Sequence, residues 1–225
     1  MSSTDLPRRT VRVLHNREVS PTARELRLER AGMEFRAGEL VSLHGAGRFD
    51  SRDYSIASGT GDDWIDVLYR LVPHGVLTPQ LLRLRAGDGV PVSGPCGAFT
   101  VRDPARPLVF IATGTGIAPC RAFLRSHPGL RLHVLHGVAE PCDLFYREEF
   151  EPAAERYLPC CSRVEHGGFQ GRIPARLEGL ELPADADFYL CGANEMIYEA
   201  TDLLVDRGVD RARIFHEPYY YRVEA

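Results

Sequence analysis

Four residues, Arg52 to Ser55 (RDYS), place a guanidinium, an aromatic ring and a hydroxyl close together. Arginine binds phosphate oxygens through paired N–H groups, and an aromatic side chain can pack on a flat ligand ring. Many loops contain such a tetrapeptide, so alone it identifies nothing. It predicts a binding site only if the rest of the chain implies a ligand with a phosphate for Arg52 and a flat ring for Tyr54.

A second segment, VFIATGTGIAP, predicts a buried strand that runs into a glycine turn and then a helix. Gly114 and Gly116 would let a ligand approach the backbone, and the free N–H groups of the helix N-terminus attract anions. Pro119 suits the first helical turn. It also replaces the third glycine of the GxGxxG dinucleotide motif, so a tight turn without a ligand remains an equal alternative.

The segment PHGVLTPQLL predicts another helix N-terminus, with Thr78 as N-cap and Pro79 as the first helical residue. Together with Gly75 this is a possible anion site, which Arg52 could reach from the preceding strand. An ordinary N-cap explains the same residues.

The segment YLCGANEM predicts another strand that ends in a glycine turn, at Cys191 and Gly192. In a doubly wound sheet the carboxyl ends of the strands line the binding crevice. The two strand ends, Thr113–Gly116 and Cys191–Gly192, could therefore face one ligand. Taken alone, Cys191 is explained equally well by a structural role as a small, buried, apolar residue.

Polar and aromatic residues after position 160 could complete such a site. Ser162–Arg163 in PCCSRVEH and Arg172 in FQGRIPARL suit a phosphate monoester, although ordinary polar residues exposed to solvent, without a ligand, explain them as well. Glu217 and three consecutive tyrosines, residues 219–221, follow a predicted strand. Their rings are either core filler or a cover for a flat ligand ring.

The elements that carry these motifs change in character near residue 104. The first hundred residues are short alternating segments between Gly, Pro and Asp, which is typical of an antiparallel β-barrel. After RDPARP come continuous apolar runs separated by helical patterns, which favours a doubly wound parallel sheet. The sequence therefore predicts a two-domain β plus α/β protein, with a barrel over 1–103 and an α/β domain over 104–225.

Composition narrows the function further. The chain has 225 residues and a formal net charge of −4, so nothing favours nucleic-acid binding. No run of about 18 apolar residues predicts a membrane span, and no secretory signal is visible, so we expect a cytoplasmic protein. The six cysteines lack metal-site spacing, so we expect reduced thiols and no metal. All 27 basic residues are Arg, which excludes a Schiff-base or P-loop lysine.

Taken together and in order, RDYS, GVLT, GPCGAF, GTGIAP, CGANEM and the terminal HEPY resemble the ferredoxin–NADP reductase superfamily. The resemblance covers nearly the whole chain. It implies an FAD-binding antiparallel barrel followed by a pyridine-nucleotide domain. It also explains the opening motif, because it implies that Arg52 contacts flavin phosphate, Tyr54 packs on the flavin ring and Ser55 hydrogen-bonds near flavin N5.

The resemblance assigns the remaining site residues. It implies that Ser55, Cys191 and Glu217 are catalytic, with Cys191 packed beside the nicotinamide rather than acting as a nucleophile. The residues implied to bind the flavin are Arg52, Tyr54, Ser55, Leu68, Tyr69, Arg70, Gly75, Val76, Thr78 and Tyr219, with Tyr220 or Tyr221 as alternatives to Tyr219. Those implied to bind the pyridine nucleotide are Thr113, Gly114, Thr115, Gly116, Ser162, Arg163, Arg172, Cys191 and Gly192.

The choice of nucleotide depends on two opposing features. Ser162–Arg163 and GRIPARL resemble the segments with which bacterial ferredoxin or flavodoxin reductases hold the 2′-phosphate of NADP. The segment HGVAEPCDLFYREEF instead resembles oxygenase reductase components, many of which use NADH, and Glu140 and Asp143 would repel a phosphate. The resemblance therefore favours NADP(H) over NAD(H) and leaves both open.

The predicted activity is hydride transfer from NADPH to FAD, and then transfer of single electrons to an external ferredoxin or flavodoxin. The first 36 residues hold eight Arg against five acids, an excess that could dock an acidic carrier; a solvated mixed-charge face explains it equally. Alternatives are an NADH-dependent reductase component of an oxygenase or P450 system, and a free-flavin reductase. A nucleotide-binding redox sensor or an electron-transfer subunit is the alternative without turnover.

Overall fold

The computed structural model describes residues 6–47, 50–164 and 168–219. The chain forms two compact units. The first comprises Met1–Val101 with Ala118–Ser126, and the second comprises Arg102–Ile117 with His127–Ala225. The helix after the GTGI turn thus belongs with the first unit. A single boundary between residues 103 and 104 would instead group this helix with the second unit.

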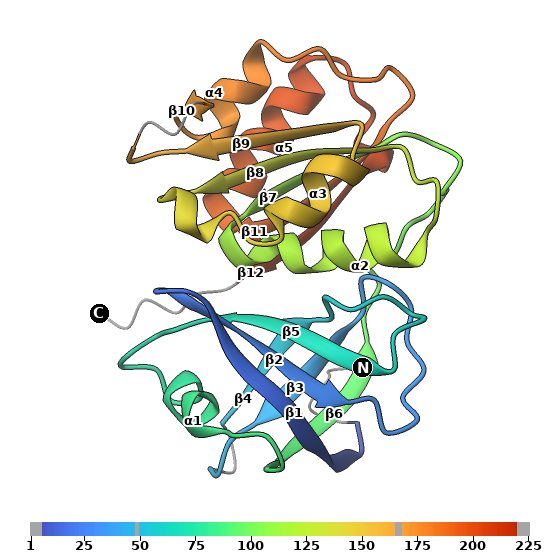
Figure 1. Cartoon of the computed structure of the whole chain (residues 1–225). Coiled ribbons are helices and arrows are strands. Elements are labelled where there is room, and N and C mark those ends of the chain that lie inside the picture. The colour runs from blue at the N-terminus through green and yellow to red at the C-terminus, as the bar shows by residue number, and fades with distance from the viewer. Residues whose placement is uncertain (1–5, 48–49, 165–167, 220–225) are drawn as a thin grey trace. The chain divides into compact units, whose positions relative to one another are not determined.

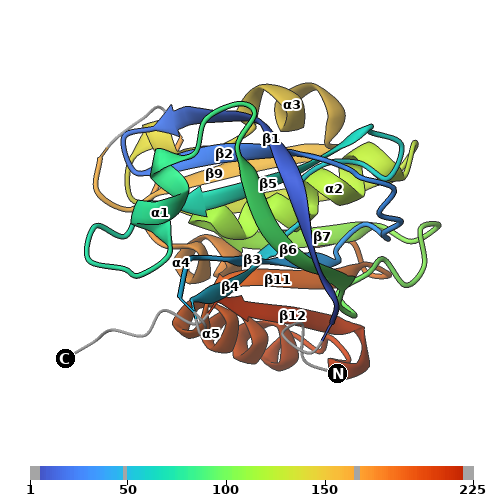
Figure 2. The same cartoon turned by 90° about the horizontal axis from the view of Figure 1, so that it is seen from below.

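The first unit is an antiparallel barrel (Figures 1 and 2). Its strands are β1 (Arg8–Ser20), β2 (Ala23–Glu29), β3 (Leu40–His44), β4 (Ser51–Ser55), β5 (Trp64–Arg70) and β6 (Gly89–Cys96), in the order β4-β3-β6-β1-β2-β5. A bridge between Ile56 and Val67 connects the two ends of this order. Two helices complete the unit, α1 (Thr78–Arg83) and α2 (Ala118–Ser126).

The barrel core follows the alternation that the sequence shows. On β5 the side chains of Ile65, Val67 and Tyr69 are buried in the core, together with Leu26 and Leu28 of β2. Residues between them point to the opposite face, because side chains alternate along a strand. The two faces of β5 therefore have separate roles.

The helix predicted at LTPQLLRLR begins one residue earlier than expected. Its N-cap is Leu77, and Thr78 is already helical, so the prediction of Thr78 as N-cap is wrong. The Thr78 hydroxyl donates to the carbonyl of Val72 at 2.9 Å and accepts from its N–H at 3.0 Å. This side chain closes the preceding loop, and it cannot cap the helix at the same time.

The second unit is a parallel sheet with helices on both faces (Figure 1). Its strands are β7 (Leu108–Thr113), β8 (Leu132–Val138), β9 (Arg156–Cys161), β10 (Phe169–Gln170), β11 (Asp187–Ala193) and β12 (Ile214–Tyr219), in the order β10-β9-β8-β7-β11-β12. The helices are α3 (Arg147–Ala153), α4 (Ile173–Glu178) and α5 (Asn194–Asp206). Short 3₁₀ turns are η2 (Gly114–Ile117), η3 (Pro141–Asp143) and η4 (Arg211–Arg213). The predicted fold class is confirmed.

Strand order reverses at β7, because β8 lies on one side of it and β11 on the other. In doubly wound sheets ligands bind outside the carboxyl ends of the strands at such a switch point. β7 ends at the predicted Thr113, and the predicted Cys191–Gly192 directly precede Ala193, the last residue of β11. In the part of the chain that the structure describes, no helix is long and apolar enough to cross a membrane.

Candidate functional site

The RDYS motif forms most of strand β4. Arg52 and Tyr54 lie opposite the core residues Leu43 and Val41 of β3, so they share one face of the strand, and Ser55 lies on the other face. The Arg52 side chain is exposed and Tyr54 is half-buried, whereas Ser55 is buried. A cation and a ring thus stand on one side of the strand and a hydroxyl on the other.

Three consecutive residues of β5 were predicted to bind the flavin, and the structure separates them. Tyr69 points into the core, where its hydroxyl donates to Asn16 Oδ1 at 3.0 Å and its ring meets Tyr54 edge-on. Burial raises the pKa of Tyr69. Leu68 and Arg70 point to the opposite face of β5. A ligand on the core-facing side of β5 would therefore contact the side chain of Tyr69. A ligand on the opposite side would contact those of Leu68 and Arg70.

The loop before α1 carries the other predicted flavin contacts. The Gly75 N–H donates to the Val72 carbonyl at 2.9 Å, inside the loop that Thr78 closes. Val76 is 53% exposed. Because the Thr78 hydroxyl already bonds the Val72 backbone, Thr78 is better placed to shape this loop than to contact a phosphate.

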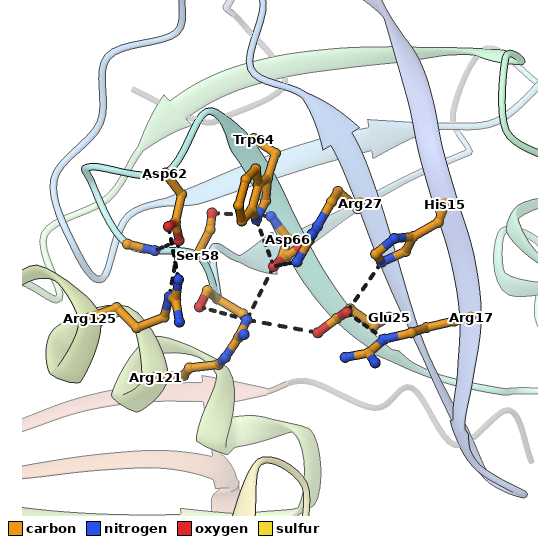
Figure 3. A network of polar contacts seen from close by, with 12 residues as sticks. His15, Arg17, Glu25, Arg27, Ser58, Asp62, Trp64, Asp66, Arg121 and Arg125 are labelled. Carbon is orange, nitrogen blue, oxygen red and sulfur yellow. Dashed lines mark hydrogen bonds and ion pairs between the residues drawn. The ribbon is translucent and has the colours of Figure 1, made fainter. Parts of the chain in front are cut away.

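The outer face of β2 and β5 carries a buried ion-pair network that the motifs did not indicate (Figure 3). Arg121 of α2 places its Nη1 3.2 Å from Asp66 and 3.8 Å from Glu25. The three side chains are at most 6% exposed. Burial removes all three charged groups from water. The attraction between the guanidinium and the two carboxylates must therefore offset their lost hydration.

A metal ion is a second interpretation of the same place. Ligand atoms of His15, Glu25 and Asp66 lie within 4.8 Å of one another. Guanidinium groups already bond both carboxylates, and Asp66 receives a two-pronged contact from Arg27 at 2.7 and 2.9 Å. The contacting arginines are Arg17, Arg27 and Arg121. Their positive charge would repel a cation, so we interpret the cluster as an ion-pair network.

The structure brings the two predicted strand ends of the second unit into direct contact. The Ala193 N–H donates to Thr113 Oγ1 at 2.9 Å. A Cβ at Gly116 would lie 2.4 Å from the carbonyl oxygen of Cys191, and one at Gly192 would lie 2.2 Å from Thr113 Oγ1. Only glycine fits at these two positions. The GTGI turn and the CG turn therefore form one continuous backbone surface at the switch point.

Glu217 lies beside Cys191 in the sheet. Pairing aligns Ala112 of β7 with Cys191 of β11, and Cys191 with Glu217 of β12. Residues in register on parallel strands point to the same face, so the cysteine and the carboxylate are neighbours on one face. Tyr219 is paired with Ala193 at the end of the same strands, whereas Tyr220 and Tyr221 lie outside the described residues.

His136 of β8 is a residue that the sequence interpretation missed. Its Nε2 is 3.1 Å from the carbonyl oxygen of Gly114, and its Nδ1 is 3.1 Å from the Tyr157 hydroxyl. Burial lowers the pKa of His136 to about 4. The available signal was a histidine inside the apolar run LRLHVLHG, one residue before a glycine.

The predicted phosphate residues lie at the ends of β9 and β10. Gln170 pairs with Cys161, so Ser162–Arg163 and the Gly171–Arg172 segment are adjacent. Ser162 and Arg163 are exposed. Arg172 is ion-paired with two carboxylates of α5, Glu195 at 3.2 Å and Glu199 at 3.7 Å. Arg163 is thus the more available cation of the two for an anionic ligand.

Two domain families match consecutive parts of the chain, and the second match includes α2. Residues 10–101 match the oxidoreductase FAD-binding domain family, and residues 110–202 match the oxidoreductase NAD-binding domain family. The chain is thus an oxidoreductase with an FAD-binding barrel before an NAD-binding sheet.

Two proteins of known name and one solved structure are similar to nearly the whole chain. The chain is 33% identical over 235 residues to ferredoxin–NADP reductase B of Sorangium cellulosum, covering 92% of the chain and 96% of that protein. It is 30% identical over 221 residues to the toluate 1,2-dioxygenase electron transfer component of Pseudomonas putida, covering 90% of the chain and 65% of that protein. The cytochrome P450 reductase GcoB of Amycolatopsis superposes with a TM-score of 0.82 at 28% identity, over 95% of this chain and 70% of that one.

The chain belongs to the ferredoxin–NADP reductase superfamily. It spans almost the full length of the Sorangium reductase and about two thirds of the toluate dioxygenase component.

Proposed function

We propose that the protein is a flavoprotein that oxidises NADPH and passes electrons singly to an external ferredoxin or flavodoxin. The observation that carries this proposal is the switch point of the second unit, where Thr113 and Gly116 contact the end of β11 and Cys191 of β11 pairs with Glu217 of β12. This switch point lies in the unit that matches the NAD-binding domain family.

The barrel residues fit FAD by the chemistry of their donors. The exposed Arg52 offers paired N–H groups to a phosphate, and Tyr54 offers a ring on the same face of β4. Ser55 and the 75–78 backbone would complete the contacts. When bound, FAD supplies a ring that accepts a hydride and releases electrons one at a time.

The residues of the chain contribute orientation and polarity. Cys191 is fully buried at the strand end, so it packs beside the nicotinamide and does not act as a nucleophile. Glu217, its neighbour in the sheet, orients the nicotinamide. Ser55 would donate a hydrogen bond to the reacting end of a bound flavin ring. Good orientation of two reactants is worth about 7–11 kcal/mol.

Replacing Ser55 or Cys191 with alanine is expected to slow flavin reduction by about tenfold, while the nucleotide Kd changes less than threefold. Each variant removes a contact that aligns the reacting rings but no contact to the nucleotide phosphates. Anaerobic stopped-flow mixing with NADPH measures both quantities. Cys160→Ala is the matched control, because that cysteine packs with α4 and α5 on the other face of the sheet. Unchanged reduction rates in both variants would contradict the assigned roles.

The preference for NADPH rests on Ser162–Arg163, which are exposed and adjacent to Arg172. The Sorangium relative is named as a ferredoxin–NADP reductase, which supports it. The ion pairs of Arg172 with Glu195 and Glu199 weaken the contribution of that arginine. We therefore assign the 2′-phosphate mainly to Arg163.

Arg163→Ala is expected to lower kcat/KM for NADPH by about 10-fold to 100-fold, the value of a hydrogen bond to a charged group. The kcat/KM for NADH should stay within a factor of two, because NADH lacks the phosphate. Arg172→Ala should have a smaller effect, and Arg211→Ala, which removes an exposed arginine elsewhere in the unit, should have none. Equal losses with both nucleotides would remove Arg163 from the phosphate site.

The second candidate is an NADH-dependent reductase component of an oxygenase or P450 system. The names of the toluate dioxygenase and P450 relatives favour it. The two candidates differ in their nucleotide and their acceptor. Steady-state assays with both nucleotides, against a ferredoxin, a flavodoxin and an oxygenase component, distinguish them. Turnover that requires added free flavin would instead make the protein a free-flavin reductase.

A further inference from the structure

His136 occupies a buried position where an apolar side chain would need no hydrogen-bond partner. It lies on β8 in register with Ala112 of β7, and it is fully buried. Its ring is surrounded by Phe145 and Tyr157, each with a ring centroid 6.4 Å away. Burying an imidazole costs free energy unless both nitrogens find partners. The two partners it has are therefore the feature to explain.

The hydrogen bonds determine which nitrogen carries the proton. A carbonyl oxygen can only accept, so Nε2 must carry the hydrogen that it shares with Gly114 at 3.1 Å. Burial holds the pKa of His136 at about 4, so the ring is neutral at pH 7 and Nδ1 is an acceptor. The Tyr157 hydroxyl, 3.1 Å away, then donates to Nδ1. The relay runs from Tyr157 through His136 to Gly114.

This relay fixes the direction of one peptide unit. In a trans peptide the C=O and the following N–H point in opposite directions. Because the Gly114 carbonyl is held toward β8, the N–H of Thr115 must point away from it. Gly114 has φ +52°, a conformation that glycine adopts without strain. Without a partner for its carbonyl, this flexible peptide could rotate.

The Thr115 N–H belongs to the start of the helical segment η2–α2 (Gly114–Ser126). The first N–H groups of a helical segment have no intrahelical acceptor and bind anions. We propose that His136 is a positioning residue for nucleotide binding: through Gly114 it aims the Thr115 N–H at the pyrophosphate of the pyridine nucleotide. This inference rests on the proposed function, and it assigns a role to a residue that touches neither nucleotide nor flavin.

The test compares two substitutions and two ligands. His136→Leu removes both hydrogen bonds, whereas His136→Gln keeps an N–H donor near the position of Nε2. NADP⁺ contains the pyrophosphate, whereas adenosine 2′-monophosphate does not. Titration calorimetry on the flavin-loaded protein gives the Kd of each. We expect His136→Leu to weaken NADP⁺ binding about tenfold and to leave adenosine 2′-monophosphate unchanged. We expect His136→Gln to stay within threefold of the wild type for both ligands.

Tyr157→Phe is the third variant, and it guards against poor folding of His136→Leu. It removes the hydroxyl that holds the tautomer and keeps the ring stacked on Phe150, with centroids 5.9 Å apart. We expect a threefold loss of NADP⁺ affinity, again without an effect on adenosine 2′-monophosphate. Phe145→Leu, which alters the same surroundings without a hydrogen bond, should change neither Kd.

The outcomes separate this inference from the proposed function. A wild-type protein that binds neither NADP⁺ nor NAD⁺ contradicts the proposed function itself. A wild-type protein that binds NADP⁺, with His136→Leu or Tyr157→Phe binding it equally well, overturns only the positioning role. Parallel loss of both ligands would show that the relay merely supports the fold, and it would also overturn the proposal.

Discussion

Gly116→Ala is expected to weaken nucleotide binding by about 5-fold to 150-fold, which corresponds to the roughly 1–3 kcal/mol typical of an overpacked site. The added Cβ would lie 2.4 Å from the carbonyl oxygen of Cys191 and 3.0 Å from the Cα of Gly192. These are backbone atoms of a sheet strand, which cannot rotate away as a side chain would. The GTGI turn must therefore separate from the end of β11.

Calorimetric titration with NADP⁺ and NAD⁺ measures this loss, and the visible flavin spectrum shows whether the barrel keeps its cofactor. We expect the flavin content to be unchanged, because Gly116 belongs to the second unit. The matched control is Gly179→Ala, at the end of α4, where φ is −98° and a Cβ would meet nothing within 4 Å. If Gly116→Ala binds nucleotide as tightly as Gly179→Ala, the contact between the two strand ends does not form the nucleotide site.

Arg121→Met is expected to lower the free energy of unfolding by about 3–5 kcal/mol, the cost of removing one partner from a buried ion pair. Methionine fills much of the space but leaves Asp66 and Glu25 with less positive charge. Arg27 still neutralises Asp66 through its two-pronged contact, so we expect a loss near the lower end of that range. Denaturant unfolding that is followed by circular dichroism gives the value.

Arg125→Met provides the matched control, one helical turn further along α2. Arg125 pairs with Asp62 at 2.8 Å, but its side chain is 33% exposed. Solvent screening limits such a pair to about 1 kcal/mol or less. Burial would raise the pKa of Asp62, and the hydrogen bonds from Arg125 and the Gly59 N–H outweigh it and lower the pKa. Equal losses in the two variants would mean that burial does not distinguish these pairs.

The architecture was accessible from the sequence because it depends on local patterns. Alternating residues predicted the barrel, and continuous apolar runs predicted the parallel sheet, so both sheets are confirmed. The meeting of Thr113 with Cys191–Gly192 follows from strand order, since adjacent strand ends must share the switch point. Glycine spacing and strand position were sufficient for these inferences.

The remaining features depend on contacts between distant residues. Arg121 pairs with carboxylates 55 and 96 positions away, and nothing in PCRAF indicates its partners. Arg172 matched a phosphate motif, but two glutamates from α5 already contact it. Thr78 looked like an N-cap because its loop partner, the Val72 backbone, is invisible to a pattern. His136 was hidden because its run is otherwise apolar.

The most direct test of the central claim is the visible spectrum of the purified protein before and after NADPH is added without oxygen. We expect a yellow protein whose flavin absorption is lost when NADPH is added, and lost more slowly with NADH. A flavin that stays oxidised with both nucleotides would contradict the proposed reductase activity. A colourless protein that oxidises NADPH only when free flavin is added would contradict the claim that FAD is held in the barrel.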